Sequence, residues 1–334
     1  MAKIITVVGA TGTQGSSVIS VLLNSKVYTI RAITRNPSSA AAQTLTAKGI
    51  EVVQADLNDI ASLRAAFTGT HAIFAVTNFF EPLLTHGSTA HAAEVEATQG
   101  INMAIAAAAT PTLEHYIWST LPDSATNSAG QAVVPYYASK NRVDAYIRSR
   151  LPDLLKRTTF LWLAWFAGNM LTLPLYTPTR IRTLDGNAKS FVQFLSIDPG
   201  TPIPLLGDEK TNAGLFVRDI LTKPHLTRDG KIVSTVLEYR SMADVVAAFA
   251  ASQGVTVRCL RLGEEDYKGL WPVWGEVFDV SHRYFEVMGS RAFTAAPGDG
   301  EGGEVTVLTK EDLGVEGLVG VEEAFAKLGQ MEWA

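Results

Sequence analysis

Residues 4–24, IITVVGATGTQGSSVISVLLN, decide the fold class of this chain. A short run of β-branched residues predicts a buried strand, and three glycines and an amphipathic helix follow it directly. Gly9 permits a tight turn, Gly12 lets the backbone approach a pyrophosphate, and Gly15 lets helix and strand pack closely. The glycines alone would be a weak signal, but between a strand and a helix they predict a dinucleotide-binding loop.

The rest of the first half alternates short apolar runs with helical patterns. The expected strands are 4–8, 28–33, 51–54, 72–76, 116–118 and 159–166, and the expected helices are 16–24, 38–48, 60–67, 90–109 and 136–150. This alternation predicts an α/β protein with a Rossmann-type doubly wound parallel sheet.

After about residue 168 the regular pattern weakens. Prolines cluster between 174 and 204, and only helices at 213–221 and 242–252 and a strand at 231–237 are clear. We therefore expect residues 1–167 to form a Rossmann domain that binds NADP. Residues 168–334 should form a smaller, mixed α/β C-terminal substrate-binding lobe that also adds elements to the sheet. Residues 297–303 are glycine-rich and acidic, which is typical of an exposed loop.

Composition excludes several classes of protein. The chain is 47% hydrophobic and 18% charged, which fits a globular enzyme and argues against a mainly disordered chain. A net charge of −5 gives no electrostatic footprint for nucleic acid. Cys259 is the sole cysteine, so no intrachain disulfide can form, and we expect a buried thiol in a strand. The six histidines lack metal-ligand spacing, so no metal site is expected.

The sequence gives no indication of a membrane segment. Residues 158–179 carry no charge, but glycine, asparagine and prolines interrupt them, so the continuous apolar part is far shorter than the ~20 residues of a spanning helix. The N-terminus runs directly into the first strand without the pattern of a signal peptide. We expect a cytoplasmic protein.

The end of the second strand predicts the choice of dinucleotide. NAD sites place an acidic residue there, ~20 residues beyond the glycine loop. Here residues 34–36 are Thr-Arg-Asn, and no acid occurs before Glu51. The guanidinium of Arg35 suits a 2′-phosphate, which favours NADP(H), although a solvated surface arginine is the alternative. Asp56 and Leu57 end the third strand, where Asp56 is either an adenine-edge contact or a helix cap.

Three residues match the requirements of carbonyl reduction. Ser119 ends the fifth strand, and Tyr136 and Lys140 follow four residues apart, on one face of a helix. A phenol can donate a proton to the carbonyl oxygen, a nearby ammonium would lower its pKa, and a serine hydroxyl can hold the oxygen. Asn102 is either part of a proton relay or a structural amide.

The chain resembles the NmrA-like family of the atypical short-chain dehydrogenase/reductase superfamily. The motifs that carry the resemblance are residues 8–15 (VGATGTQG), 31–37 (RAITRNP), 53–57 (VQADL), 76–79 (VTNF), 136–140 (YYASK) and 169–170 (NM). The resemblance implies either an NADPH-dependent reductase or a regulator that binds dinucleotide and lacks the active-site tyrosine. The presence of Tyr136 distinguishes this sequence from the regulators and favours catalysis.

These observations predict an NADPH-dependent reductase of a small apolar or aromatic carbonyl, or a related C=X substrate. The alternative is a non-catalytic NADP(H)-binding redox sensor that acts through a protein partner. The expected cofactor residues are Gly9, Thr11, Gly12, Thr13, Gln14, Gly15, Arg35, Asn36, Asp56, Leu57, Thr77, Asn78 and Lys140, and the expected substrate pocket is Phe79, Phe80, Trp165, Phe166 and Met170. The expected partner is a small-molecule substrate, with no nucleic acid or membrane.

Overall fold

A computed structural model of the chain describes residues 2–181, 190–294 and 306–329. The glycine-rich loop expected at 297–303 lies outside the described residues. One eight-stranded sheet dominates the structure, in the order β14-β11-β6-β5-β4-β1-β2-β3. Its strands are β1 (Lys3–Val7), β2 (Tyr28–Thr34), β3 (Glu51–Gln54), β4 (Ala72–Ala75), β5 (His115–Thr120), β6 (Thr158–Trp162), β11 (Lys231–Ser234) and β14 (Val307–Leu308). All neighbouring pairs are parallel. The predicted doubly wound Rossmann-type sheet is confirmed.

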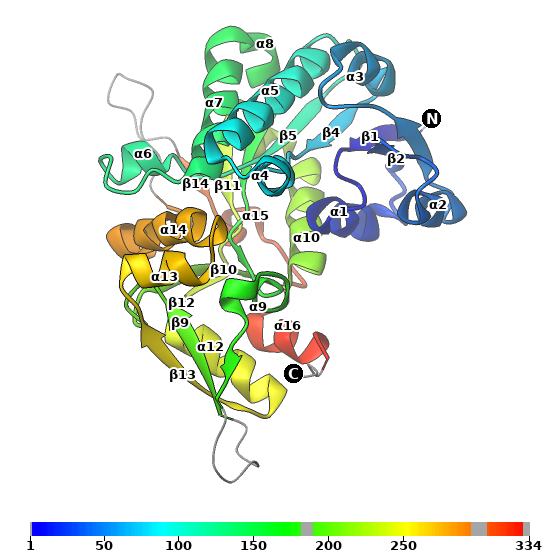
Figure 1. Ribbon diagram of the computed structural model, residues 1–334. Coiled ribbons are helices and arrows are strands. Elements are labelled where there is room, and N and C mark those ends of the chain that lie inside the picture. The colour runs from blue at the N-terminus through cyan, green and yellow to red at the C-terminus, as the bar shows by residue number, and fades with distance from the viewer. Residues whose placement is uncertain (1, 182–189, 295–305, 330–334) are drawn as a thin grey trace.

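Helices cover both faces of this sheet (Figure 1). Helices α3, α5 and α7 pack side by side over one face, and α1 and α10 pack together over the other. The helices of this layer and their connections are α1 (Thr13–Leu22), α2 (Ala40–Ala47), α3 (Ile60–Phe67), α4 (Phe80–His86), α5 (Thr89–Ala108), α6 (Ser124–Asn127), α7 (Pro135–Arg150), α8 (Pro152–Leu155), α10 (Glu209–Thr222), α11 (Pro224–Thr227) and α15 (Lys310–Leu313).

A smaller lobe lies below the carboxyl ends of the central strands in Figure 1. It contains two three-stranded sheets, in the orders β12-β10-β7 and β13-β9-β8. Its strands are β7 (Trp165–Phe166), β8 (Thr179–Arg180), β9 (Ser190–Leu195), β10 (Pro202–Gly207), β12 (Glu238–Ser241) and β13 (Thr256–Arg261). Its helices are α9 (Asn169–Thr172), α12 (Met242–Gln253), α13 (Glu264–Leu270), α14 (Trp274–Met288) and α16 (Val321–Lys327), with 3-10 turns at Pro174–Tyr176 and Gly289–Arg291.

The strand predicted over 159–166 is wrong as a single element. It divides between β6, which belongs to the large sheet, and β7, which pairs with β10 of the lobe. The hydroxyl of Thr235 accepts a hydrogen bond from the amide of Ala164 and donates one to the carbonyl of Trp162, both at 3.0 Å. The Thr235 side chain thus satisfies two hydrogen-bonding groups of the backbone where the chain leaves the large sheet. The strand predicted over 231–237 accordingly ends at Ser234.

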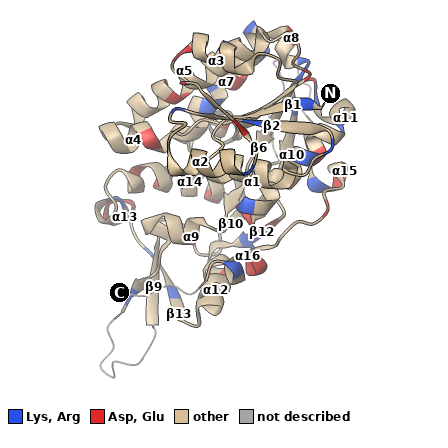
Figure 2. Cartoon of the chain, turned by 90° about the vertical axis from the view of Figure 1, so that its right-hand side faces the viewer, with Lys and Arg blue, Asp and Glu red and all other residues tan. Residues whose placement is uncertain are grey.

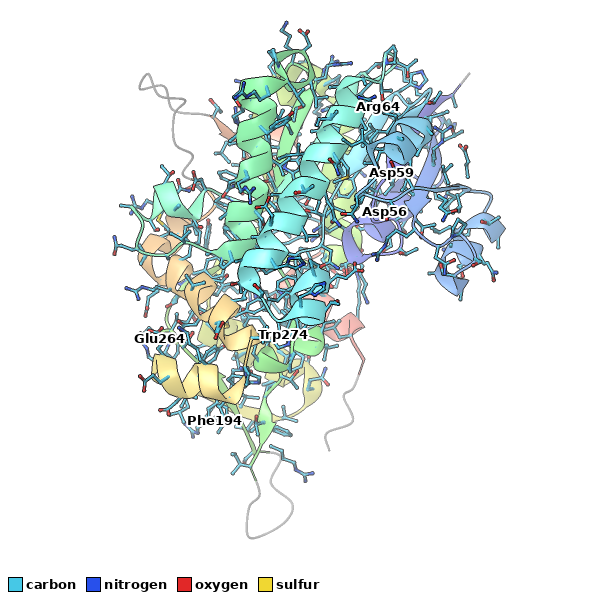
Figure 3. The ribbon with its side chains drawn as sticks, turned by 45° about the horizontal axis from the view of Figure 1, so that its top comes forward. Asp56, Asp59, Arg64, Phe194, Glu264 and Trp274 are labelled. Atoms are coloured by element: carbon cyan, nitrogen blue, oxygen red, sulfur yellow. The ribbon has the colours of Figure 1, made fainter. Side chains whose placement is uncertain are left out.

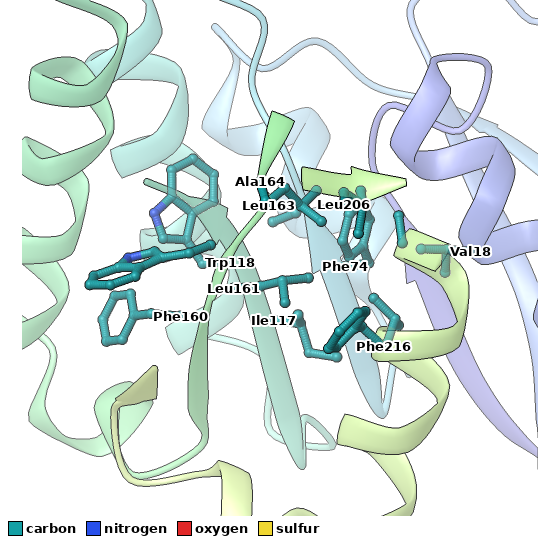
Figure 4. Close-up of a cluster of buried hydrophobic side chains, with 14 of the residues drawn as sticks. Val18, Phe74, Ile117, Trp118, Phe160, Leu161, Leu163, Ala164, Leu206 and Phe216 are labelled. Carbon is teal, nitrogen blue, oxygen red and sulfur yellow. The ribbon is translucent and has the colours of Figure 1, made fainter. Parts of the chain in front are cut away.

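The core is continuous from the sheet to the helix layer below it. Phe74, Ile117 and Leu161 project from three neighbouring strands, and they pack with Val18 of α1 and Phe216 of α10 (Figure 4). All five side chains are fully buried. Burial of each contributes about 1.5–3 kcal/mol relative to exposure, which holds α1 and its preceding loop firmly on the sheet.

The charged residues are interspersed in sign over the surface seen in Figure 2. None of the helices within the described ranges is both long and apolar enough to cross a membrane. Cys259 lies in β13, a strand as predicted, but its thiol is only partly buried. The reason is that β13 is an edge strand, paired with β9 alone.

Candidate active site

The glycine loop has the backbone geometry that a phosphate site requires. Gly9 has φ +66°, which only glycine adopts at low cost, and its carbonyl accepts a hydrogen bond of 2.9 Å from the Gly12 amide. A Cβ atom on Gly15 would lie 2.2 Å from the Gly9 oxygen. No side chain caps the first turn of α1, and no acidic residue occupies it. The free amides of that turn therefore fit a pyrophosphate.

A cavity of about 630 Å³ begins at this loop and extends under the lobe. It opens between the carboxyl ends of β1 and β4, where the strand order reverses and where doubly wound sheets bind their ligands. Its wall includes Ser119, Tyr136 and nearly all the predicted cofactor and pocket residues: Gly9, Thr11, Gly12, Thr13, Gln14, Gly15, Arg35, Asp56, Leu57, Thr77, Asn78, Lys140, Phe79, Phe80, Trp165 and Phe166. The fold thus brings together one cofactor half and one aromatic half.

Two predicted residues lie elsewhere. Asn36 is outside the cavity wall, and its side-chain oxygen accepts a hydrogen bond of 3.0 Å from the amide of Ser38. Met170 is fully buried in the core, because α9 turns its side chain inward. Among the other aromatic residues of the lobe, Phe285 reaches the cavity wall, whereas Trp271, Trp274 and Tyr284 do not.

Arg35 lies at the mouth of the cavity with an acidic partner. Its Nη1 is 2.7 Å from Oε1 of Glu81, at the start of α4, and the two side chains are 62% and 48% exposed. The pair bridges the ends of β2 and β4 across the cofactor half. Because both groups are well exposed, the bridge contributes little stability, and a ligand phosphate can compete for the guanidinium.

Side chains of the loop after β3 form hydrogen bonds with the backbone of that loop and of the first turn of α3. Asp56 and Asp59 are labelled in Figure 3. Asp56 accepts a hydrogen bond of 2.8 Å from the amide of Asn58, while the cap of α3 is Asp59, which accepts from Ala61 at 2.9 Å. Asp56 is therefore not the helix cap. Asn102 donates to the carbonyl of Leu57 at 2.9 Å, which makes it a structural amide that anchors this loop.

Lys140 is held in a buried network that sequence reasoning missed. Its Nζ lies 2.8 Å from Oε1 of Glu96 and 2.8 Å from Oγ1 of Thr77, and the Thr77 hydroxyl donates to the same carboxylate oxygen at 2.8 Å. Ser139 donates to the other oxygen of Glu96. The side chains of Lys140 and Glu96 are 10% and 0% exposed, so the ammonium is neutralised where it meets the cavity.

The three predicted catalytic residues line one cavity, but each has its own partner. The Tyr136 hydroxyl lies 2.7 Å from Oγ of Ser281 on α14, and Ser119 donates to the side chain of Gln14 at 2.7 Å. Within the described ranges, no hydrogen bond joins Ser119, Tyr136 and Lys140 to one another. Burial raises the pKa of Tyr136 to about 12, opposed by its contacts with Ser281 and Tyr137. The expected lowering by Lys140 is not observed, since the pKa of Tyr136 is raised and Lys140 is not among the groups that shift it.

The aromatic half of the cavity joins the two parts of the molecule. Phe80 of α4 stacks on Phe278, with centroids 5.8 Å apart and planes within 6°, and on Trp274 at 5.5 Å. Trp274 follows Val273, which has φ +70°, and its amide donates to the carbonyl of Pro272 at 2.9 Å. This is a strained γ-turn, and it positions the Trp274 ring against Phe80.

The cavity wall also includes residues that were not among the expected site residues, such as Glu96, Tyr137, Tyr176, Phe278 and Ser281. The sequence pattern of α5 does indicate that Glu96 is buried. It shares a helical face with Gly100, Met103 and Ala107, all buried, so its position in the period marks it as buried too. The lobe residues carry no comparable signal, because Tyr176 and the α14 residues Phe278 and Ser281 meet the cavity only after folding.

Comparisons with known proteins identify relatives of the sequence and of the fold. The sequence is 37% identical over 257 residues to notA of Aspergillus sp. (strain MF297-2), named as an NmrA-like family domain-containing oxidoreductase, which covers 75% of this chain and 74% of notA. The fold is similar to that of NmrA, a negative transcriptional regulator solved with NAD (TM-score 0.72, 24% identity, 98% and 95% coverage) and with NADP (TM-score 0.70, 24% identity, 98% and 95% coverage). It is also similar to QOR2, the NADPH-dependent quinone oxidoreductase of Escherichia coli, complexed with NADPH (TM-score 0.67, 19% identity, 97% and 99% coverage).

The NmrA-like family profile matches residues 1–295, which include the glycine loop, the cavity and α14. That span contains the cofactor half and the aromatic half of the cavity. The chain therefore belongs to the NmrA-like family.

Proposed function

We propose that the protein is an NADPH-dependent reductase of small apolar or aromatic carbonyl compounds, or of related C=X bonds. One observation carries this proposal: the cavity runs without interruption from the glycine loop to an aromatic chamber that contains the Tyr136 phenol. Relatives named as oxidoreductases support the same class of activity.

The cofactor half fits NADP(H) through the chain's own groups. The free amides of α1 would hold the pyrophosphate, and the exposed guanidinium of Arg35 would hold the 2′-phosphate once Glu81 releases it. Lys140 and Thr77 lie where the nicotinamide ribose would bind, beside the end of β4. Bound NADPH would supply the hydride.

The aromatic half would bind the substrate and complete the reduction. Phe80 and Phe278 line this half with apolar aromatic surface, and the charged wall residues are concentrated in the cofactor half. Because its pKa is about 12, Tyr136 carries its proton at physiological pH and can donate it to the substrate oxygen. The Ser281 hydroxyl then stabilises the phenolate by donating a hydrogen bond.

The substrate class can be tested by following NADPH oxidation with benzaldehyde, acetophenone, 1,4-naphthoquinone and pyruvate. We expect turnover, or at least competitive binding to the NADP complex, for the aromatic compounds and neither for pyruvate, because a carboxylate would lose its hydration among aromatic rings. Calorimetry of the NADP complex measures the binding. Tight binding of pyruvate and none of the aromatic compounds would contradict this assignment of the chamber.

Arg35→Ala should narrow the preference for NADPH over NADH. Loss of a charge-assisted contact costs about 1.5–3 kcal/mol, which corresponds to roughly tenfold or more in relative affinity. Glu81→Gln is the matched variant, because it removes the competing acid and should strengthen NADPH binding. Fluorescence titration with both dinucleotides measures the ratio, and equal affinities in the unmutated protein would refute the role of Arg35.

A dinucleotide-binding regulator is the second candidate, and one observation favours it. Glu96 already neutralises Lys140, the group that would otherwise assist the phenol. Such a regulator would bind NADP(H) through the same loop and act through a protein partner. Tight NADP binding without oxidation of NADPH by any carbonyl compound would support it over the reductase.

A further inference from the structure

Arg35 lies where two cavities meet. It lines the cavity of about 630 Å³ that begins at the glycine loop, and it also lines a second cavity of about 360 Å³. The second cavity is formed at the end of β3 and the start of α3, and its wall includes Asp56, the residue expected at the adenine edge. In a dinucleotide the adenosine ribose joins the pyrophosphate to the adenine, so this ribose would lie beside Arg35.

Glu81 brings to this position the acidic group that the end of β2 lacks. Its Oε1 lies 2.7 Å from Nη1 of Arg35, although Glu81 belongs to the first turn of α4 and Arg35 follows β2. Because β1 lies between β2 and β4 in the sheet, the pair spans the glycine loop that follows β1. The fold thus supplies, from another strand end, an acid that the sequence around Arg35 does not contain.

Both members of this pair keep groups that can bind a ligand. Among the described residues, the side chains of Arg35 and Glu81 form no ion pair or hydrogen bond other than the one that joins them. The second carboxylate oxygen of Glu81 and the remaining N–H groups of Arg35 are therefore available. Asp56, the other acid beside Arg35, already accepts two hydrogen bonds through Oδ1 from Asn58, at 2.8 and 2.9 Å.

A ribose hydroxyl and a phosphate make opposite demands on this pair. A 2′-hydroxyl both donates and accepts hydrogen bonds, so it can donate to the Glu81 carboxylate and accept from Arg35 while the ion pair stays intact. A 2′-phosphate only accepts, and it carries a charge of about −1.5 to −2 at pH 7. It would bind Arg35 but repel Glu81, and it must displace that carboxylate from the guanidinium.

We propose that Glu81 is a second determinant of dinucleotide choice, which accepts a hydrogen bond from the adenosine 2′-hydroxyl of NAD(H). The inference rests on the proposed function, because it uses the assignment of the adenosine ribose to Arg35. Arg35 selects for the 2′-phosphate, whereas Glu81 selects for the 2′-hydroxyl and against the phosphate. The protein therefore binds NADH as a second cofactor, and its preference for NADPH is smaller than Arg35 alone would give.

Glu81→Ala tests the proposal when the dissociation constants of NADH and NADPH are measured by fluorescence titration. We expect NADH to bind roughly tenfold more weakly, as for the loss of a hydrogen bond to a charged group. NADPH should bind up to about fivefold more tightly, since the competing ion pair is exposed. The opposite signs are diagnostic. Both dinucleotides carry a negatively charged pyrophosphate, so removal of the Glu81 charge alone would strengthen the binding of both.

A dinucleotide without the hydroxyl identifies the atom that Glu81 contacts. NAD⁺ that lacks the 2′-hydroxyl of its adenosine ribose should bind the unmutated protein roughly tenfold more weakly than NAD⁺ does. Glu81→Ala should weaken the binding of NAD⁺ by a similar factor and should not weaken that of the 2′-deoxy analogue, because the two changes remove the same interaction. Equal effects of Glu81→Ala on NAD⁺ and on the analogue would overturn the proposal.

Glu94→Ala is the matched control, because Glu94 is also an exposed carboxylate paired with an arginine, Arg142 at 2.8 Å, but lies outside the cavity wall. It should leave the dissociation constants of both dinucleotides unchanged. If Asp56→Asn weakens NADH binding and Glu81→Ala does not, Asp56 is the acceptor and the proposal is wrong.

These measurements need no substrate, so failure of the proposal and failure of the reductase are distinguishable. Tighter binding of both dinucleotides to Glu81→Ala would overturn the role of Glu81 and leave the reductase standing. The expected affinities without reduction of any carbonyl compound would refute the reductase and leave the role of Glu81 standing. Absence of binding of either dinucleotide to the unmutated protein would overturn both.

Discussion

Tyr136→Phe is expected to lower the turnover of an aromatic carbonyl by ~10²–10⁴-fold, because it removes the proton donor of the reduction. The phenylalanine ring keeps the contacts of Tyr136 with Phe80 and Phe278, so the fold and the affinity for NADPH should change little. Single-turnover hydride transfer and steady-state turnover should fall together. Stopped-flow absorbance of NADPH measures both.

Tyr116→Phe provides a matched control for this experiment. Tyr116 is fully buried in β5, its hydroxyl has no hydrogen-bond partner among the described residues, and it lies outside the cavity wall. Removing that oxygen should leave turnover unchanged. If Tyr136→Phe reduces the substrate at the normal rate, another group donates the proton and Tyr136 only packs against the substrate.

Glu96→Ala is expected to destabilise the protein by about 3–5 kcal/mol, because it leaves the Lys140 ammonium buried without its counter-ion. It also removes the acceptor of the Thr77 and Ser139 hydroxyls, so several hydrogen bonds are lost at once. Urea denaturation at neutral pH should show the loss as a lower midpoint with an unchanged slope.

Two further variants separate the buried charge from general effects of the substitution. Glu96→Ala combined with Lys140→Met should recover part of the lost stability, since no ammonium then remains unpaired. Glu94→Ala breaks the pair with Arg142 between the same two helices, α5 and α7, and should have little effect because that pair is exposed. Equal losses of stability for Glu94→Ala and Glu96→Ala would show that the buried pair stabilises the fold no more than the exposed pair.

The nucleotide-binding half was predictable because its local signals agree with its tertiary structure. Strand, glycine loop and helix follow one another within the first 22 residues, and the observed β3 and α3 have the expected bounds. The apolar run over 159–166 was not resolvable, since it contains no glycine or proline where it leaves the sheet. The break depends on Thr235, a residue 71 positions beyond Ala164, and no local pattern reports such a contact.

The site residues that belong to local sequence motifs were predictable, whereas those brought together only by the tertiary fold were not. Arg35, Ser119, Tyr136 and Lys140 all line the cavity, because the ends of parallel strands meet at one edge. Their electrostatic partners were not foreseen. Glu96 lies 44 residues before Lys140, and Ser281 lies 145 residues after Tyr136, so each environment exists only after folding.

The eight-stranded sheet also constrains the order in which the chain can fold during synthesis. β6 has β5 on one side, but its other neighbour, β11, lies some 70 residues later, and β14 follows at Val307–Leu308. A nascent chain that ends after β6 therefore exposes the unpaired edge of β6, which β5 separates from β4 and the nucleotide site. Because such long-range pairing closes slowly, this edge of the sheet is completed only after β11, and then β14, have left the ribosome.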